Sequence, residues 1–422
     1  MAPTSRPPSV DALARSLGGS GLPHPVLVEI ARDAIAAGDP ESAQAAAEAV
    51  QLRLLQPVIN ATGVLLHTNL GRAPVAHSQA AAFSNVEFDL TTGARGSRHA
   101  HAANLIALAC GAESALVVNN CAAAVLLVLG ALAANKHVVV SRGELVEIGG
   151  GFRVPEVMEQ SGALLREVGT TNRTRVADYE SAASGGDVAL LMKIHQSNYR
   201  ITGFTEEATT AQLAGLGIPL VVDIGSGLLD SRTPWLGSGP PPAWLAGEPA
   251  ARQNLDDGAA LVTFSGDKLF GGAQAGIIAG RSDLVQACAA HPLARALRPG
   301  GLVLASLQAT ALAYLRRDGG AIPFWAMATA APESLTARAE SVVATAGLGQ
   351  VIDTEAVPGG GTLPGVTIPS IGIRVAGDRT RTLRSRPQPI IARVDDEGTV
   401  LDLRTVQPTE DAAVAAALGA LG

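Results

Sequence analysis

The feature that most constrains the fold is a series of short apolar runs that alternate with helical segments between residue 57 and about residue 280. β-Branched runs separated by helices are typical of βα units, whose parallel strands are buried on both faces. Several of the runs end in polar residues or glycine, as expected where a parallel sheet presents ligand-binding groups at its carboxyl edge. The sequence therefore predicts an α/β fold with a mostly parallel central sheet. The runs are AlaLeuValVal at 115–118, HisValValValSer at 137–141, ValAlaLeuLeuMetLys at 188–193, ProLeuValValAsp at 219–223 and AlaLeuValThrPhe at 260–264.

The segments on either side of this region have a different pattern. Apolar residues near the N-terminus recur at three- and four-residue spacing between prolines and glycines, which predicts short helices. A helical region from Leu284 to about Leu348 precedes a Pro/Gly-rich segment at 358–365 and then strands near 366–375 and 388–404. We therefore expect three domains: a small helical unit at 1–56, a large α/β domain at 57–290 and an α+β domain at 291–422.

Charge and cysteine usage narrow the class of protein. The net charge of −7 and the isoelectric point near 5.7 count against a protein that binds nucleic acid over its whole surface, although they allow a local basic patch. Three widely spaced cysteines predict no disulfide framework, so a reducing compartment fits best. The longest apolar run, Cys121 to Ala134, is shorter than the ~20 residues that span a bilayer, and the first residues lack a secretory pattern. We expect a soluble, cytoplasmic protein.

The most informative segment surrounds Lys268. An apolar strand ends at Ser265, Lys268 follows on a turn, and three glycines within 271–276 allow close approach of the backbone. A partly desolvated lysine has a lowered pKa and can condense with an aldehyde. Ser265 is expected beside it as a hydrogen-bond donor to a phosphate. An isolated lysine in a glycine-rich loop is more often a surface residue, so this hypothesis depends on the neighbouring segments.

Two other strand ends carry candidate cofactor ligands. Asp223 ends an apolar strand 45 residues before Lys268 and could keep a pyridine nitrogen protonated, which makes the ring an electron sink. Asn119 and Asn120 lie between a strand and an Ala-rich helix, whose N-terminus can hold a phosphate. Each has a simpler interpretation: Asp223 as a loop-capping residue and the asparagines as an N-cap. Cys121 is interpreted as a small packed residue.

Other catalytic patterns are missing from the sequence. The histidines form no HExxH motif, and His99 and His101 are not spaced as helical metal ligands. Neither GxSxG, nor Walker A, nor GxGxxG after a strand occurs. We predict no metal site.

Longer stretches carry a more specific signal. They are distributed along 57–300 and beyond, and the chain resembles the bacterial L-seryl-tRNA(Sec) selenium transferases, also called selenocysteine synthases. The stretches are IleAsnAlaThrGlyValLeuLeuHisThrAsnLeuGlyArgAlaPro (59–74), PheAspLeuThrThrGlyAlaArgGlySerArgHis (88–99), SerArgGlyGluLeuValGluIleGlyGly (141–150), GluValGlyThrThrAsnArgThr (167–174), His195 through GlyPheThr (203–205), the Asp223 and Lys268 segments, ProIleIleAlaArgVal (389–394) and LeuAspLeuArgThrVal (401–406).

The resemblance implies a fold and roles for particular residues. The fold is that of the aspartate-aminotransferase-like, fold type I enzymes that use pyridoxal 5′-phosphate, and Lys268 is implied to be the Schiff-base lysine. Arg295 and Arg298, with Arg95 and Arg98 nearby, are implied to bind the selenophosphate anion, for which a guanidinium group is well suited. Ordinary ion pairing with Asp or Glu is the alternative role for these arginines.

The resemblance also implies an activity. It is conversion of L-seryl-tRNA(Sec) to L-selenocysteyl-tRNA(Sec) with selenophosphate, through an aminoacrylate intermediate on the cofactor, in a homo-oligomer built as a ring of dimers. The unit at 1–56 would contact the tRNA, and an arginine group favours such a contact, although a run of arginines is usually a solvated face. A related enzyme acting on a small amino acid or sugar acid, as an ammonia lyase or aldolase, is the alternative, which the acidic charge favours. The arginines are Arg374, Arg379, Arg381, Arg384 and Arg386.

Overall fold

The computed structural model describes residues 8–77, 82–148, 151–232 and 241–422. These residues form two compact units. The smaller unit comprises residues 1–59 with 378–391, and the larger comprises 60–377 with 392–422. The three-domain division remains a prediction. None of the helices within the described ranges is long and apolar enough to cross a bilayer.

A seven-stranded sheet forms the centre of the larger unit. Its spatial order is β3-β11-β10-β9-β8-β4-β7. Strands β10, β9, β8, β4 and β7 run parallel to one another, and β11 is antiparallel to both β10 and β3. The mostly parallel sheet predicted from the sequence is therefore confirmed. The strands are β3 (Ser114–Val118), β4 (His137–Ser141), β7 (Leu164–Val168), β8 (Val188–Ile194), β9 (Leu220–Gly225), β10 (Leu261–Ser265) and β11 (Gly276–Gly280).

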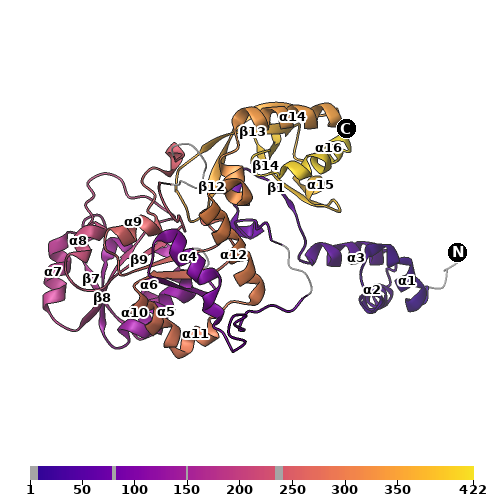
Figure 1. The fold of residues 1–422 in the computed structure, drawn as a ribbon. Coiled ribbons are helices and arrows are strands. Elements are labelled where there is room, and N and C mark those ends of the chain that lie inside the picture. The colour runs from indigo at the N-terminus through magenta and orange to yellow at the C-terminus, as the bar shows by residue number, and fades with distance from the viewer. Residues whose placement is uncertain (1–7, 78–81, 149–150, 233–240) are drawn as a thin grey trace, which may run out of the picture. The chain divides into compact units, whose positions relative to one another are not determined.

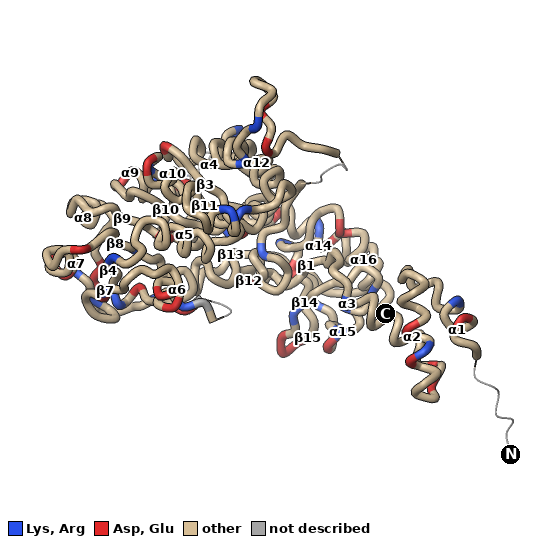
Figure 2. The backbone as a smooth tube through the Cα atoms, turned by 90° about the horizontal axis from the view of Figure 1, so that it is seen from below, with Lys and Arg blue, Asp and Glu red and all other residues tan. Residues whose placement is uncertain are grey.

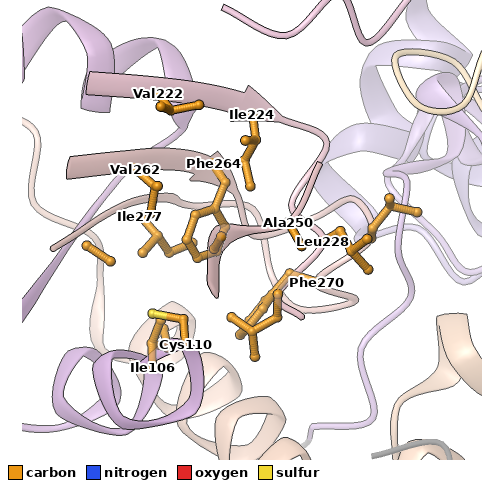
Figure 3. Packing of buried hydrophobic residues seen from close by; sticks show 14 of the residues in the cluster. Ile106, Cys110, Val222, Ile224, Leu228, Ala250, Val262, Phe264, Phe270 and Ile277 are labelled. Atoms are coloured by element: carbon orange, nitrogen blue, oxygen red, sulfur yellow. The ribbon is translucent and has the colours of Figure 1, made fainter. Parts of the chain in front are cut away.

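Helices cover both faces of this sheet (Figure 1). One face packs against the apolar side chains of α5, α6 and α10. The other packs against α4, α7, α8, α9 and α12. In Figure 3, Ile106 and Cys110 of α4 lie opposite Val262, Phe264 and Ile277 of the sheet. The helices are α4 (Ala102–Cys110), α5 (Cys121–Ala133), α6 (Val154–Ser161), α7 (Val176–Ser184), α8 (Thr210–Ala214), α9 (Ala251–Asp256), α10 (Ser282–Ala290), α11 (Pro292–Ala296), α12 (Gly301–Arg316) and α13 (Pro323–Ala328).

Side-chain alternation along β9 positions the functional groups. Successive side chains of a strand point to opposite faces. Val222 and Ile224 therefore belong to the core on the α4 side, whereas Val221 belongs to the core on the α5 side. Asp223 has the parity of Val221 and contacts Cys121, the first residue of α5. The same strand thus presents two different surfaces at its carboxyl end.

A second sheet of six strands, in the order β1-β14-β15-β13-β12-β2, carries the C-terminal α+β region. Its long β12–β13 hairpin is antiparallel, and β12 also pairs in parallel with β2. A short hairpin of β5 (Glu147–Ile148) and β6 (Phe152–Arg153) stands apart from both sheets. The remaining elements are β1 (Ile59–Ala61), β2 (Val64–Leu66), β12 (Gln350–Gly359), β13 (Ile368–Val375), β14 (Ile390–Asp395), β15 (Gly398–Asp402), α14 (Pro332–Ala346) and α16 (Asp411–Gly419).

The smaller unit contains the predicted N-terminal helices α1 (Val10–Ser16), α2 (His24–Ala36) and α3 (Ser42–Arg53). They share a small core that includes Ala14, Leu27 and Ala47. Helix α15 (Thr380–Arg384) belongs to the same unit, although more than 300 residues separate it from α3. The N-terminal helices and most of the arginine group of 374–386 therefore fall in one compact unit.

Candidate active site

Lys268 lies in the turn after β10, buried at the carboxyl end of the central sheet. Its Nζ donates a hydrogen bond to the carbonyl oxygen of Gly361 at 3.4 Å. Burial lowers the pKa of Lys268, and the positive charge of Arg72 lowers it further, against the opposing charges of Asp223 and Asp267. A lowered pKa increases the fraction of the neutral amine, which is the form that attacks an aldehyde.

Asp223 lies one strand away, on β9, and its side chain is also buried. Thr263, its register partner on β10, donates from Oγ1 to Oδ1 of Asp223 at 2.9 Å. The Sγ of Cys121 donates to the same oxygen at 3.4 Å. Burial nevertheless raises the pKa of Asp223, and it raises the pKa of the Cys121 thiol well above its ordinary value. A protonated pyridine nitrogen fits this position, since its positive charge would offset the desolvation of the carboxylate.

The two asparagines have structural partners at the start of α5. The Oδ1 of Asn120 accepts from the backbone N–H of Ala123 at 2.9 Å, which makes Asn120 the N-cap of α5. With its amide nitrogen turned toward Leu297 and Arg298, Asn119 donates to their carbonyl oxygens at 3.1 and 3.0 Å, an orientation chosen by the hydrogen-bond network. The first-turn N–H groups of α5, which have no acceptors within the helix, remain the groups suited to a phosphate.

Ser265 belongs to a buried polar chain beside Lys268. Its Oγ donates to Oδ1 of Asp267 at 2.8 Å, and Nη1 of Arg72 donates to Oδ2 of Asp267 at 2.9 Å. Asp267 is almost fully buried, so its charge requires these donors. Arg72, Asp267 and Thr263 were not among the residues selected from the sequence. All three fall within the stretches that carry the family resemblance, so the resemblance could have indicated them.

Three of the four predicted anion-binding arginines converge on one carboxylate, Glu87. Arg98 contacts Glu87 at 3.0 Å and also donates to the carbonyl oxygen of Pro299 at 2.8 Å. Arg95 and Arg298 lie 3.3 and 3.4 Å from the Glu87 carboxylate. The hydrogen bond from Arg98 is the main cause that lowers the pKa of Glu87, so this carboxyl is ionised at neutral pH. Three guanidinium groups against one carboxylate leave an excess of positive charge.

Arg295 does not join this group. It lies exposed on α11, and its side chain makes no ion pair with any residue in the described part of the chain. Glu87 was not identified from the sequence, because it lies in an irregular segment without periodicity or motif. The ion pairing considered as an alternative role for the arginines is thus present, and the surplus positive charge is still compatible with an anion.

The fold defines a class of protein. The structure of a D-glucosaminate-6-phosphate ammonia-lyase aligns with 87% of this chain and 96% of its own, with a TM-score of 0.58 at 22% sequence identity. The predicted aspartate-aminotransferase-like, fold type I α/β architecture is confirmed.

The sequence comparisons define the family within this class. The family model for L-seryl-tRNA selenium transferase matches residues 58–407. The L-seryl-tRNA(Sec) selenium transferase of Moorella thermoacetica is 48% identical over 390 residues, covering 86% of this chain and 81% of its own. That of Solidesulfovibrio magneticus is 46% identical over 393 residues, with coverages of 86% and 81%. The chain belongs to the L-seryl-tRNA selenium transferase family, and the resemblance predicted from the sequence is confirmed.

Proposed function

We propose that this enzyme converts L-seryl-tRNA(Sec) to L-selenocysteyl-tRNA(Sec) with selenophosphate, and that pyridoxal 5′-phosphate is held covalently by Lys268. The observation that carries the proposal is the buried Lys268 beside a buried Asp223 at the carboxyl edge of the sheet, in a chain of this family. When bound, the cofactor supplies an electron sink that stabilises negative charge at the substrate α-carbon.

Each residue of the site has a proposed task. The Asp223 carboxylate would accept a hydrogen bond from the protonated ring nitrogen, with its orientation fixed by Thr263. The first turn of α5, capped by Asn120, binds the phosphate together with Ser265, and Asn119 ties this turn to the end of α11. Once the amine of the seryl group has displaced Lys268 from the cofactor, the freed Nζ, whose pKa burial lowers, would remove the α-proton of the seryl group.

The arginines around Glu87 are proposed to bind selenophosphate. A multiply charged anion displaces part of the interaction that Arg95, Arg98 and Arg298 make with Glu87, and the exposed Arg295 approaches it from α11. The ion pairs with Glu87 keep the guanidinium groups close together when the anion is absent. This reduces the ordering that anion binding has to impose.

The smaller unit supports the proposed tRNA contact. Arg379, Arg381 and Arg384 are exposed in this unit, together with α1–α3. Arg374, in contrast, belongs to the larger unit and is paired with Asp395 and Glu397. A cytoplasmic location follows from the proposed substrate, because charged tRNA is used there. A homo-oligomeric ring of dimers is likewise proposed, and mass measurement in solution tests it.

Borohydride trapping tests the cofactor assignment. Protein reconstituted with pyridoxal 5′-phosphate should carry a reduced pyridoxyl adduct on the peptide that contains Lys268, and Lys268→Ala should lose both the adduct and the reaction. An adduct elsewhere, or turnover by Lys268→Ala, would contradict the assignment. Conversion of seryl-tRNA(Sec), compared with free serine and sugar acids, separates the proposed function from a lyase or aldolase activity.

A variant pair tests the anion site. Arg298→Ala should raise the KM for selenophosphate about tenfold, the order expected for a charged hydrogen bond, while the Lys268 adduct is retained. Arg281→Ala is the matched control, because Arg281 is also exposed and ion-paired, with Asp283. An equal KM in Arg298→Ala and Arg281→Ala would assign Arg298 to structure alone.

A further inference from the structure

A cavity of about 340 Å³ lies at the carboxyl edge of the central sheet, on the face of β9 opposite Asp223. Val222 and Ile224 line it, and these side chains alternate with Asp223 along the strand. Leu363 and Pro364 form another part of its wall. The cavity therefore adjoins the candidate active site without containing Lys268 or Asp223.

Three stretches that carry the family resemblance, and to which the proposed reaction assigns no role, meet at this cavity. They are 141–150, 167–174 and the segment from His195 to 205, which contribute Ser141, Thr171 and His195 among others. The first two follow β4 and β7, and the third follows β8. Carboxyl ends of adjacent parallel strands are where α/β proteins place ligands. This convergence points to a ligand rather than to packing.

The lining of the cavity includes a buried carboxylate, Glu248, whose Oε1 accepts no hydrogen bond from any residue in the described ranges. Glu248 is 7% exposed, and its Oε1 lies 3.4 Å from Nε2 of His195. Neither atom makes a hydrogen bond to any residue in the described ranges. By contrast, the other buried carboxylate in the wall, Glu144, is satisfied by Lys193 and by the backbone N–H of Ile194. A buried acceptor such as Glu248 favours a ligand that presents an N–H group.

The exposed lining of the cavity carries both charges, because Glu206 and Glu207 belong to it. Arg173 and Arg200 belong to it as well, and both are exposed. Within the described ranges neither side chain makes a hydrogen bond or an ion pair, unlike the neighbouring Arg175, which pairs with Glu206. Exposed guanidinium groups at an open mouth suit a phosphate. The cavity thus combines a buried acceptor, apolar walls and two exposed guanidinium groups.

A turn links the cavity to the reacting lysine. The carbonyl oxygen of Gly361 accepts the hydrogen bond from Lys268, and Leu363, two residues later, lines the cavity. Two residues span at most ~7 Å. Leu363 has a positive φ of 48°, a conformation that is costly for a branched side chain and that positions it in the wall. A ligand in the cavity can therefore be joined to a group at Lys268 by a short linkage.

We propose that this cavity binds the terminal adenosine nucleotide of the acylated tRNA, an inference that rests on the proposed function. The exocyclic amine of adenine donates to Oε1 of Glu248, the ring lies between Val222, Ile224 and Leu363, and the phosphate meets Arg173 and Arg200. The ester on the ribose then places the seryl group on the Lys268 side of the 359–364 turn. Glu248 and the two arginines are positioning residues for the substrate.

Calorimetric titration of the holoenzyme with adenosine 5′-monophosphate and inosine 5′-monophosphate tests this proposal. The inosine nucleotide carries a carbonyl where adenine carries the amine, so it should bind at least about tenfold more weakly. Glu248→Gln, whose amide can donate to that carbonyl, should remove most of this preference. Arg173→Ala, at an exposed position where folding is not at risk, should weaken the binding of both nucleotides equally. Arg281→Ala should leave both binding affinities unchanged.

Kinetics separate this inference from the proposed function. Arg173→Ala should raise the KM for seryl-tRNA(Sec) several-fold while kcat and the Lys268 adduct stay unchanged. If the proposed reaction is wrong, no variant yields product but the nucleotide preference persists. Absence of binding at millimolar adenosine 5′-monophosphate, equal affinity for the two nucleotides, or an unaffected Arg173→Ala would overturn the inference. A changed oligomeric state in Arg173→Ala would assign the cavity to a second copy of the chain and overturn it as well.

Discussion

The hydrogen bond from Thr263 to Asp223 should control how strongly the buried carboxylate holds its charge. Thr263→Val removes the donor at 2.9 Å and nearly preserves the shape of a side chain that is fully buried. A hydrogen bond to a charged group contributes about 1.5–3 kcal/mol. Because this hydrogen bond lowers the pKa of Asp223, its loss should raise that pKa further, beyond the rise that burial already causes.

The raised pKa of Asp223 determines how the stability of the folded protein changes with pH. Because the folded-state pKa of Asp223 lies above its ordinary value of 3.8, the folded protein binds this proton more tightly than the unfolded chain does. The contribution of Asp223 to stability is fully present below pH 3.8 and is lost as the pH rises through the raised pKa. Thr263→Val should extend this loss to higher pH, so that the variant differs most from the parent at neutral pH.

Urea unfolding of the cofactor-free protein at acidic and neutral pH measures the effect. We expect a loss of about 1.5–3 kcal/mol at neutral pH and less in acid, with Thr263→Ser close to the parent. In an Asp223→Asn background the same substitution should cost only about 0.5–1.5 kcal/mol, the value for a neutral hydrogen bond. An equal penalty in both backgrounds would refute the reasoning and attribute the loss to packing.

Three further outcomes are expected. Asp267→Asn removes a negative charge that raises the pKa of Lys268, so this pKa should fall. The acidic limb of the pH profile of kcat/KM should then move to lower pH. A shift to higher pH would contradict this reasoning. Glu87→Gln should lower the KM for selenophosphate by about threefold or less, because an ion pair near the surface is weak. The KM should also depend more steeply on salt concentration. A raised KM would mean that Glu87 orders the arginines. Gly276→Ala places a Cβ 2.0 Å from the backbone oxygen of Asn120 and should cost about 1–3 kcal/mol in thermal unfolding. Gly300→Ala, which meets nothing within 4 Å, should be neutral.

The sequence predicted the central strands well, because β-branched runs between helices give a strong local signal. All five runs are strands of the central sheet. Two strands escaped the prediction for physical reasons. β11 begins and ends with glycine, and Gly276 is required by the close approach of Asn120 rather than by a turn. β7 is an edge strand, and its mixed polar and apolar residues resemble a loop.

The candidate site was predictable only in its local parts. The turn after β10 indicated a partly desolvated lysine, and Lys268 is buried. The acceptor of its hydrogen bond, Gly361, lies 93 residues away on the β12–β13 connection, which no local pattern could indicate. Glu87 is equally remote from Arg298, at 211 residues. Contacts of this kind are set by tertiary packing, so only the family resemblance could suggest which residues meet.

The acidic net charge illustrates a different limit of sequence reasoning. A total of −7 counts against a nucleic-acid partner only if the whole surface acts as one charge. At physiological ionic strength, however, exposed charges more than ~8 Å apart are largely screened from one another. Figure 2 shows acidic and basic residues side by side near α7, β4 and β7, where they offset one another locally. The proposed tRNA contact therefore depends on the exposed arginines of the smaller unit and of the cavity mouth, and the charge of the rest of the chain has little influence on it.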